Sequence, residues 1–405
     1  MKHADLIAGA AGIAPRITAL RRAIHAEPEL GLHTPKTRDK VREALAHLPL
    51  EWREGPSTTG LVAVLRGTAP ATNATPRCRS VLLRGDMDAL AMPEETGLPF
   101  ASAVPGTMHA CGHDAHTAML AGAAELLCHR ADRLAGEVRF MFQPGEEGYH
   151  GARCMIDDGL LDPLPDAAFA LHVMPTAPHG IVAGRAGPLL AAADQIDIVV
   201  EGSGGHASMP HQTRDPVPVA CEIVLALQTM VTRQFDAHDP VVVTVTSLHA
   251  GTAHNVVPNR VALRGTMRSL SRGNRARLGE AVRLLAAGIA GAHGLTAEVT
   301  ITEGFPVTLC DPRAVAFGET VSRELFGGEA FARLDAPIMG AEDFAYVLEK
   351  VPGAMFFLGV SHAGEDWTRC CGIHSTRMML DESVMPRGAA LLAALAETFL
   401  ERGFG

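Results

Sequence analysis

The stretch SVLLRGDMDAL (residues 80–90) decides the fold, because it is a short apolar run that ends abruptly in acidic residues. LVAVLRG (61–67), VRFMFQ (138–143) and DAAFALHVMP (166–175) are further apolar runs of similar length. Such runs, bounded by turn residues, are typical of buried strands. An alanine- and leucine-rich segment at 116–130 predicts a helix between them. Strands that alternate with helices predict an α/β domain with a mainly parallel sheet flanked by helices on both faces.

The two ends of the chain have the same α/β character. The first segment, from Ile7 to Leu48, has helical periodicity and ends before Pro49. Residues 68–79, rich in Pro, Thr and Ala, predict a surface loop. The tail predicts a strand at 354–360 among helices at 317–326, 342–349 and 382–401.

The pattern changes after Pro188. Four strands and two helices follow in the order βαββαβ: 195–202, 215–234, 241–250, 259–270, 275–294 and 295–304. This order is typical of an α+β sandwich of the ferredoxin-like type. We therefore expect a catalytic domain split in sequence, at 1–188 and 304–405, with an inserted ferredoxin-like domain at 189–303.

Composition excludes several classes of protein. A chain of 405 residues, 47% hydrophobic and 20% charged, suits two globular domains. A net charge of -10 and the lack of a Lys/Arg run argue against nucleic-acid binding. No stretch approaches the roughly 18 uncharged apolar residues that span a bilayer, so no membrane partner is expected. The eight scattered cysteines predict reduced thiols in a cytoplasmic protein.

The segment MHACGHDAHTAML (108–120) is the richest in chemistry. Cys111 and His113 flank Gly112, and a thiolate and an imidazole on such a loop can both turn toward one Zn²⁺ or similar ion. The alternative is a Cys-nucleophile hydrolase in which His113 or His116 activates the thiol.

Acidic and imidazole groups follow four of the predicted strands. Ligand sites of open α/β sheets lie at the carboxyl ends of strands, so these groups predict one shared site: Asp86 and Asp88, Glu146 and Glu147, His172, and His374. Adjacent side chains point in different directions. One glutamate can therefore bind metal while its neighbour faces water on that metal.

Nine motifs together resemble the dinuclear-metal amidohydrolases, a family typified by hippurate hydrolases, aminoacylase-like N-acyl-amino-acid hydrolases and auxin-conjugate hydrolases. They span nearly the whole chain: RRAIHAEPELG (21–31), RGDMDAL, MHACGHDAHT, FQPGEEG, LHVMP, GSGGHASMPH (202–211), GTAHNVVPN (251–259), GAEDFAYVLEKVPGAMFFLG (340–359) and IHSTRMMLDES (373–383). His33 departs from the family, which commonly has Glu there, and Ala91 stands where Pro is common.

The resemblance implies two divalent ions, Zn²⁺ first, with Mn²⁺, Co²⁺ or Ni²⁺ as alternatives. It implies five metal ligands: Cys111, His113, Glu147, His172 and His374. The Cys111 thiolate matches a bridging position, Glu146 matches the general base, and Asp88 matches an aspartate that orients a metal-site neighbour. The partition of the remaining ligands between the ions stays open.

The resemblance also implies a substrate and a partner. His206 is a candidate to reach the active site, including that of a partner subunit, and Asn255 and Arg268 are candidates for holding a substrate carboxylate. The implied reaction is hydrolysis of the linear amide bond of a small N-acyl-amino acid. A homodimer or higher homo-oligomer would form through the inserted lid or dimerisation domain.

Two rival functions remain. A Cys-nucleophile hydrolase would resist chelators, whereas alkylation of its thiol would block it even with metal bound. A catalytically silent metal-binding sensor of the same fold would lack the base or a ligand, but the base and all five ligand positions are present.

Overall fold

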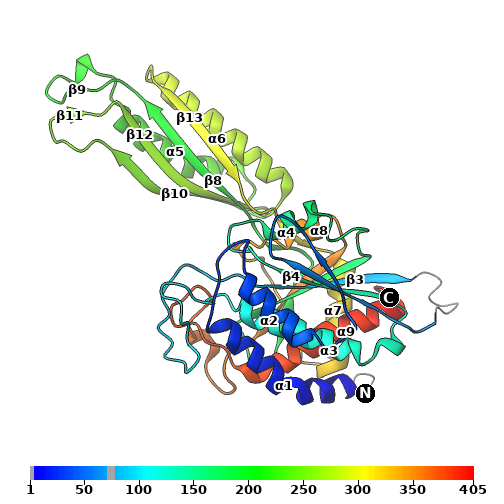
Figure 1. Cartoon of the computed structure of the whole chain (residues 1–405). Coiled ribbons are helices and arrows are strands. Elements are labelled where there is room, and N and C mark those ends of the chain that lie inside the picture. Colours follow the sequence, from blue (N-terminus) through cyan, green and yellow to red (C-terminus); the bar gives the residue numbers. More distant parts are fainter. Residues whose placement is uncertain (1–3, 71–77) are drawn as a thin grey trace. The chain divides into compact units, whose positions relative to one another are not determined.

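The computed structural model describes residues 4–70 and 78–405, which divide into two compact units (Figure 1). Unit 1 comprises Met1–Leu189, Leu309–Ala336 and Asp343–Gly405, and unit 2 comprises Leu190–Thr308 and Pro337–Glu342. The boundaries predicted from sequence for the inserted domain, 189–303, did not include Pro337–Glu342, which belongs to unit 2. Most of the loop expected at 68–79 lies outside the described residues.

Unit 1 is built on an eight-stranded sheet in the order β1-β2-β4-β3-β5-β16-β6-β15. The four central strands β4, β3, β5 and β16 are parallel, whereas β1, β2 and β6 each pair antiparallel to a neighbour. This confirms the mainly parallel sheet. The strands are β1 (Glu51–Glu54), β2 (Leu61–Arg66), β3 (Arg79–Asp86), β4 (Gly136–Gln143), β5 (Ala167–Met174), β6 (Val182–Gly184), β15 (Phe331–Arg333) and β16 (Gly353–Gly359).

Helices flank this sheet on both faces (Figure 1). Helices α3 and α9 pack on β3, α1 packs on both of them, and α4 packs on β4 and on α8. The helices are α1 (Ala4–His25), α2 (Pro35–Leu45), α3 (His113–Cys128), α4 (Gly151–Asp157), α7 (Pro312–Phe326), α8 (Ala345–Leu348) and α9 (Met385–Arg402). By length and composition the segment Glu382–Arg402 could cross a membrane, but 78% of its most apolar 18-residue window is buried inside the protein, as in a core helix.

The helical periodicity expected from Ile7 to Leu48 does not correspond to one helix, because the chain forms two helices there, α1 and α2. Residues 26–34 leave the helical conformation, and Gly31 has a φ of 67°. Leu30 instead forms a bridge with Ala89, just beyond β3. Tertiary pairing therefore overrides helical periodicity at this point. Sequence reasoning also missed short elements such as β1, α4, β6 and β15.

Unit 2 confirms the βαββαβ order. Its antiparallel sheet has the strand order β10-β12-β8-β13, and α5 (Pro216–Gln234) and α6 (Arg272–Ala292) pack against it. The strands are β8 (Ala192–Glu201), β10 (Val241–Ala250), β12 (Arg260–Ser269) and β13 (Thr296–Glu303). Unit 2 also contains the short pair of β9 (Gly205–His206) with β11 (Val256–Val257). A further short pair, β7 (Gly187–Leu190) with β14 (Thr308–Cys310), has most of its residues in unit 1.

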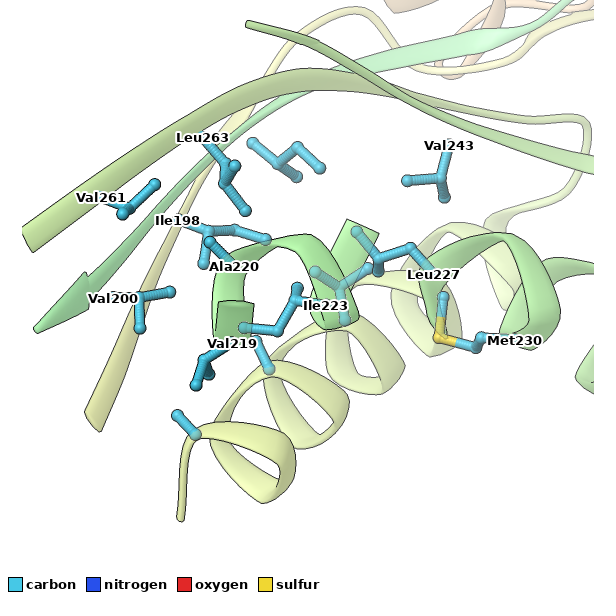
Figure 2. Close-up of a cluster of buried hydrophobic side chains, with 14 of the residues drawn as sticks. Ile198, Val200, Val219, Ala220, Ile223, Leu227, Met230, Val243, Val261 and Leu263 are labelled. Atoms are coloured by element: carbon cyan, nitrogen blue, oxygen red, sulfur yellow. The ribbon is translucent and has the colours of Figure 1, made fainter. Parts of the chain in front are cut away.

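The core of unit 2 lies between the sheet and the two helices (Figure 2). On α5, Val219, Ile223, Leu227 and Met230 recur every three or four residues and form one buried stripe. Asp215 caps this helix by accepting a hydrogen bond from the Val217 N–H at 3.0 Å. Unit 2 therefore has a hydrophobic core of its own. Burial of one leucine in this core contributes about 1.5–3 kcal/mol.

Candidate metal centre

The loop that precedes α3 and the first residue of α3 present the first two candidate ligands, Cys111 and His113. Gly112 caps α3 with a φ of 85°, and a Cβ atom there would lie 2.3 Å from Cγ2 of Val173 on β5. Only glycine fits both the left-handed backbone and this close approach. The glycine thus lets Cys111 and His113 lie against the carboxyl end of β5.

All five predicted ligands lie in unit 1, and the structure brings them together. Cys111, His113 and His172 form one group, and Cys111, Glu147 and His374 form another, with the ligand atoms of each group within 4.8 Å of one another. The Cys111 Sγ lies 3.4 Å from the His172 Nε2, and the His374 Nε2 lies 3.3 Å from the Glu147 Oε1. The two groups share Cys111, the residue that the family resemblance implies as the bridge.

The backbone of His374 explains how a residue on a loop reaches this cluster. Its N–H donates a 2.8 Å hydrogen bond to the carbonyl of Ala110, next to Cys111. His374 is one of two non-glycine residues with a positive φ among the described residues, at 62°. The hydrogen bond fastens the His374 loop to the Cys111 loop, so two ligands distant in sequence are held side by side.

Burial shifts the pKa values of two candidate ligands, His172 and Cys111, in opposite directions. The Nδ1 of His172 lies 2.7 Å from the Val173 carbonyl, which leaves the Nε2 lone pair toward Cys111. Burial lowers the pKa of His172 well below its usual value, so the ring is neutral. Burial raises the pKa of the Cys111 thiol to about 12. A thiol with such a pKa is a poor free nucleophile, but a bound cation would stabilise its thiolate.

Three buried polar atoms in this cluster lack a hydrogen-bond partner: both ring nitrogens of His113 and the Oε1 of Glu147. Buried polar atoms without partners are rare and costly. A thiolate, imidazoles and a carboxylate form a donor set that suits Zn²⁺ and similar divalent ions. The unpartnered atoms and the donor set both fit bound metal.

Asp88 holds the turn that follows β4. Its carboxylate accepts hydrogen bonds from the backbone N–H groups of Glu146 at 2.9 Å and Glu147 at 3.0 Å. Its Oδ1 also lies 3.4 Å from the His113 Nδ1, an ion-pair contact rather than a hydrogen bond. Asp88 therefore contacts two segments of the site at once, the turn after β4 and the start of α3.

Glu146, the predicted general base, lies beside the candidate ligands. It is buried, and a carboxylate oxygen lies within 4.8 Å of ligand atoms of His113 and Glu147. Because Asp88 fixes both backbone amides of the turn, Glu146 and Glu147 keep separate directions.

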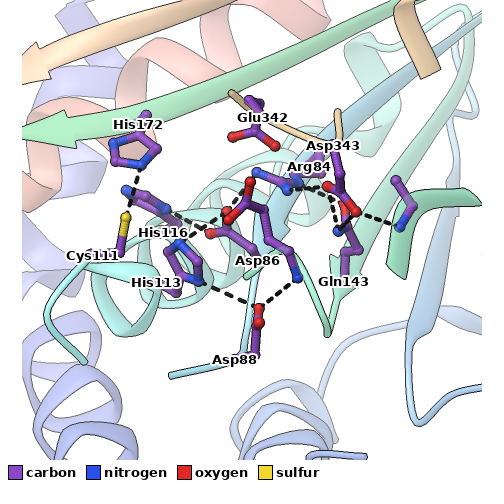
Figure 3. Close-up of polar contacts among 12 residues, drawn as sticks. Arg84, Asp86, Asp88, Cys111, His113, His116, Gln143, His172, Glu342 and Asp343 are labelled. Atoms are coloured by element: carbon purple, nitrogen blue, oxygen red, sulfur yellow. Dashed lines mark hydrogen bonds and ion pairs between the residues drawn. The ribbon is translucent and has the colours of Figure 1, made fainter. Parts of the chain in front are cut away.

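A buried layer of polar side chains adjoins the candidate ligands (Figure 3). The sequence indicated Asp86 as a strand-end group and His116 as a candidate neighbour of Cys111, but not the contacts of Asp86 with Arg84 and His116. Burial by itself would raise the pKa of Asp86, but Arg84, His113 and His116 hold it well below its usual value. The available signal was Arg84 itself, because an arginine within a buried strand requires a partner.

Comparison with known proteins shows the family. Residues 82–398 match the model of peptidase family M20/M25/M40. The chain belongs to this family. The M20 chain is 38% identical to thermostable carboxypeptidase 1 of Saccharolobus solfataricus over 95% of each chain. It is 36% identical to N-acetylcysteine deacetylase of Bacillus subtilis, over 95% of this chain and 97% of that protein.

A solved structure supports the same assignment. The M20 chain resembles a Bacillus subtilis protein described as a dinuclear metal binding peptidase, with a TM-score of 0.82 and 32% identity, over 97% of this chain and 99% of that one. The resemblance inferred from the motifs is thereby confirmed. The chain is a member of a family of metal-dependent hydrolases that act on amide bonds.

The three substrate-binding candidates of this M20 chain all lie in unit 2, at two places. His206 on β9 and Asn255 lie together, since the Ala207 N–H donates to the Asn255 carbonyl at 3.0 Å. Arg268 lies near the other end of β12, half-buried, paired with Ala193. The eight residue steps from Arg260 to Arg268 span about 27 Å of strand. The structure brings the first two candidates together, but not the third.

Proposed function

We propose that this M20 enzyme hydrolyses the amide bond of small N-acyl-amino acids. The observation that carries the proposal is that Glu146 lies beside two ligand groups that share Cys111. The names of two relatives, a carboxypeptidase and an N-acetylcysteine deacetylase, describe removal of an amino acid or an acyl group at an amide bond. Both names fit a substrate that keeps a free carboxylate.

The proposed ligands of two divalent ions are Cys111, His113, Glu147, His172 and His374. When bound, such ions supply Lewis acidity, which lowers the pKa of water and polarises a carbonyl group. Glu146 removes a proton from the water that attacks the acyl carbon, and it then delivers that proton to the leaving amine. Asp88 keeps the Glu146 backbone in place during both transfers.

For substrate binding we keep His206, Asn255 and Arg268 as the proposed groups. Because Arg268 lies about 27 Å along the sheet from the end near Asn255, one copy of unit 2 cannot hold a single carboxylate with both. The proposal therefore includes a homodimer in which each copy contributes one end of its unit 2. All eight cysteines are free thiols, which favours a reducing, cytoplasmic location.

Glu146→Gln tests the proposed base. The amide keeps the shape of the side chain but cannot accept a proton, so kcat on N-acetyl and N-benzoyl amino acids should fall by about 10²- to 10⁴-fold. Metal content by elemental analysis should stay at the wild-type level. Glu125→Gln is the control, because Glu125 is also buried but lies near the other end of α3. Turnover near wild type in Glu146→Gln would remove Glu146 from this role.

Chelation separates the rival functions. We expect activity to disappear when metal is removed and to return with Zn²⁺, Mn²⁺, Co²⁺ or Ni²⁺, the best of which identifies the preferred ion. Activity that survives chelation but not thiol alkylation would instead support a Cys111 nucleophile. Metal binding without turnover on any N-acyl-amino acid of a broad panel would support a sensor.

A further inference from the structure

A buried polar network lies next to the metal centre, and its central residue is Arg84 on β3 (Figure 3). The guanidinium donates hydrogen bonds to Asp86 Oδ2 at 2.6 Å, to Asp343 Oδ1 at 3.0 Å and to Gln143 Oε1 at 2.8 Å. All four side chains are at most 2% exposed. The Arg84 charge is thus held between two carboxylates in the interior of unit 1.

The far side of the network is itself fixed. Asp343 accepts hydrogen bonds from the Gln143 amide at 2.8 and 2.9 Å and from the Ala152 backbone N–H at 2.9 Å. The planar fork of an arginine can satisfy three such acceptors in different directions, and a lysine ammonium cannot reproduce that geometry. Arg84 therefore has a defined orientation, set by β4 and by the segment that precedes α8.

The near side of the network reaches the candidate ligands. The Val173 N–H donates to the His116 Nε2 at 2.8 Å, so the His116 proton is on Nδ1, which donates to the Asp86 Oδ1 at 2.6 Å. Val173 directly follows the candidate ligand His172. Asp86 thus links Arg84 to the end of β5 through His116.

A second link runs to the other buried imidazole. The Asp86 Oδ2 lies 3.5 Å from the His113 Nε2. Because one Asp86 oxygen is bound to Arg84 and the other to His116, this carboxylate is held away from the metal-ligand role. Without the guanidinium, Asp86 Oδ2 would be free to pair with His113 and to compete with an ion for it.

We propose that Arg84 is a positioning residue for the metal centre, which acts through Asp86 on His113 and, through His116, on the strand that carries His172. The inference rests on the proposed metal-dependent function. It predicts that loss of Arg84 weakens metal binding itself, beyond any loss of stability.

The test compares Arg84→Met with Arg139→Met. Arg139 is a matched control, because it is equally buried on the neighbouring strand β4 but bonds to Glu137 and to the carbonyls of Leu161 and Pro163. Zn²⁺ and Co²⁺ affinities are measured by competition with a chelator, and the unfolding midpoint of each metal-free protein is recorded. Both variants should lower that midpoint, but only Arg84→Met should weaken metal binding, by about 10- to 100-fold.

Two further variants keep the inference testable if Arg84→Met does not fold. Arg84→Lys keeps the charge without the fork and should bind metal with an affinity between those of wild type and Arg84→Met. Asp343→Asn keeps the shape of the Arg84 support but removes its charge, and should also weaken binding. Wild-type metal affinity in Arg84→Met or in Asp343→Asn, or equal losses in Arg84→Met and Arg139→Met, would overturn the inference.

The same titration distinguishes a failure of the proposed function. If the wild-type protein itself binds no Zn²⁺ or Co²⁺, the metal-dependent function is wrong. If the wild type binds metal and the variants bind equally well, the function stands and only the role of Arg84 is wrong.

Discussion

Asp88→Asn is the substitution that most sharply tests how the site is held together. The carboxylate faces donors on every side: the backbone N–H groups of Glu146 and Glu147, at 2.9 and 3.0 Å, and the His113 Nδ1, at 3.4 Å. If His113 binds an ion through Nε2, its proton is on Nδ1 and points to Asp88. An asparagine of the same shape has one acceptor oxygen and one NH₂ group. Whichever way it turns, the NH₂ meets a donor.

The size of the effect follows from this mismatch. A hydrogen bond to a charged group contributes about 1.5–3 kcal/mol, and at least one is lost in Asp88→Asn. At about 1.36 kcal/mol for each factor of ten, kcat/KM should fall by roughly 10- to 150-fold. Substitution of groups that orient metal ligands commonly costs about 10- to 100-fold in metal affinity or activity, which agrees with this range.

The assay is kcat/KM on an N-acetyl amino acid, together with metal content and the unfolding midpoint. Asp166→Asn is the matched control, because Asp166 accepts a 2.8 Å hydrogen bond from the Ser80 N–H before the opposite end of β5. That control should retain wild-type kcat/KM. A value for Asp88→Asn within twofold of wild type, with the protein folded, would refute the assignment of Asp88 as the residue that orients this turn.

Three further predictions concern other parts of the chain. Gly112→Ala should lose metal affinity more than Gly148→Ala, measured by chelator competition, because both glycines have a φ of 85° but only a Cβ at the first meets β5; equal losses would contradict this. Leu227→Ala should cost about 2–5 kcal/mol in chemical denaturation without changing metal content, since Leu227 is fully buried in unit 2. Burial favours neutral His25, but Asp114 outweighs it and raises the pKa of His25. Protonated His25 therefore stabilises the fold below about pH 6.5, and this contribution is lost as the pH rises through the folded pKa. The metal-free wild type should lose more of its unfolding midpoint between about pH 6 and 9 than His25→Gln does, and parallel curves would count against it.

The sequence predicts the strands well where burial is uniform and poorly where tertiary contacts decide. β10 was expected at 241–250 and is found there, because its apolar run has clear ends. The segment from Ile7 to Leu48 has helical periodicity throughout, but the bridge between Leu30 and Ala89 interrupts the helix. That bridge joins residues far apart in sequence, so local pattern contains no sign of it.

The candidate ligands could be predicted because their residue types bind metal ions and because most of them follow predicted strands. The residues and contacts that position these ligands could not be predicted. Gly112 can be recognised in the sequence as a turn residue. The reason that no other residue fits there depends on Val173, which lies 61 positions away and approaches Gly112 only in the folded chain. Similarly, the exposed loop that carries His374 reaches Cys111 through a backbone hydrogen bond to Ala110, which no side-chain pattern reveals.

Arg84 and Arg139 show where sequence reasoning ends. Both are arginines inside buried strands, but only Arg84 lies two residues before a group that the sequence assigns to the site, Asp86. Side chains at i and i+2 share one face of a strand, so the contact of Arg84 with Asp86 follows from β3 alone. The contact with Asp343 joins residues 259 positions apart and exists only because of the fold. Asp343→Asn therefore tests the contact that depends on the fold, whereas the contact between Arg84 and Asp86 depends on β3 alone. If it binds metal as tightly as the wild type, the contact of Arg84 with Asp343 has no effect at the metal centre, and the positioning role proposed for Arg84 is wrong.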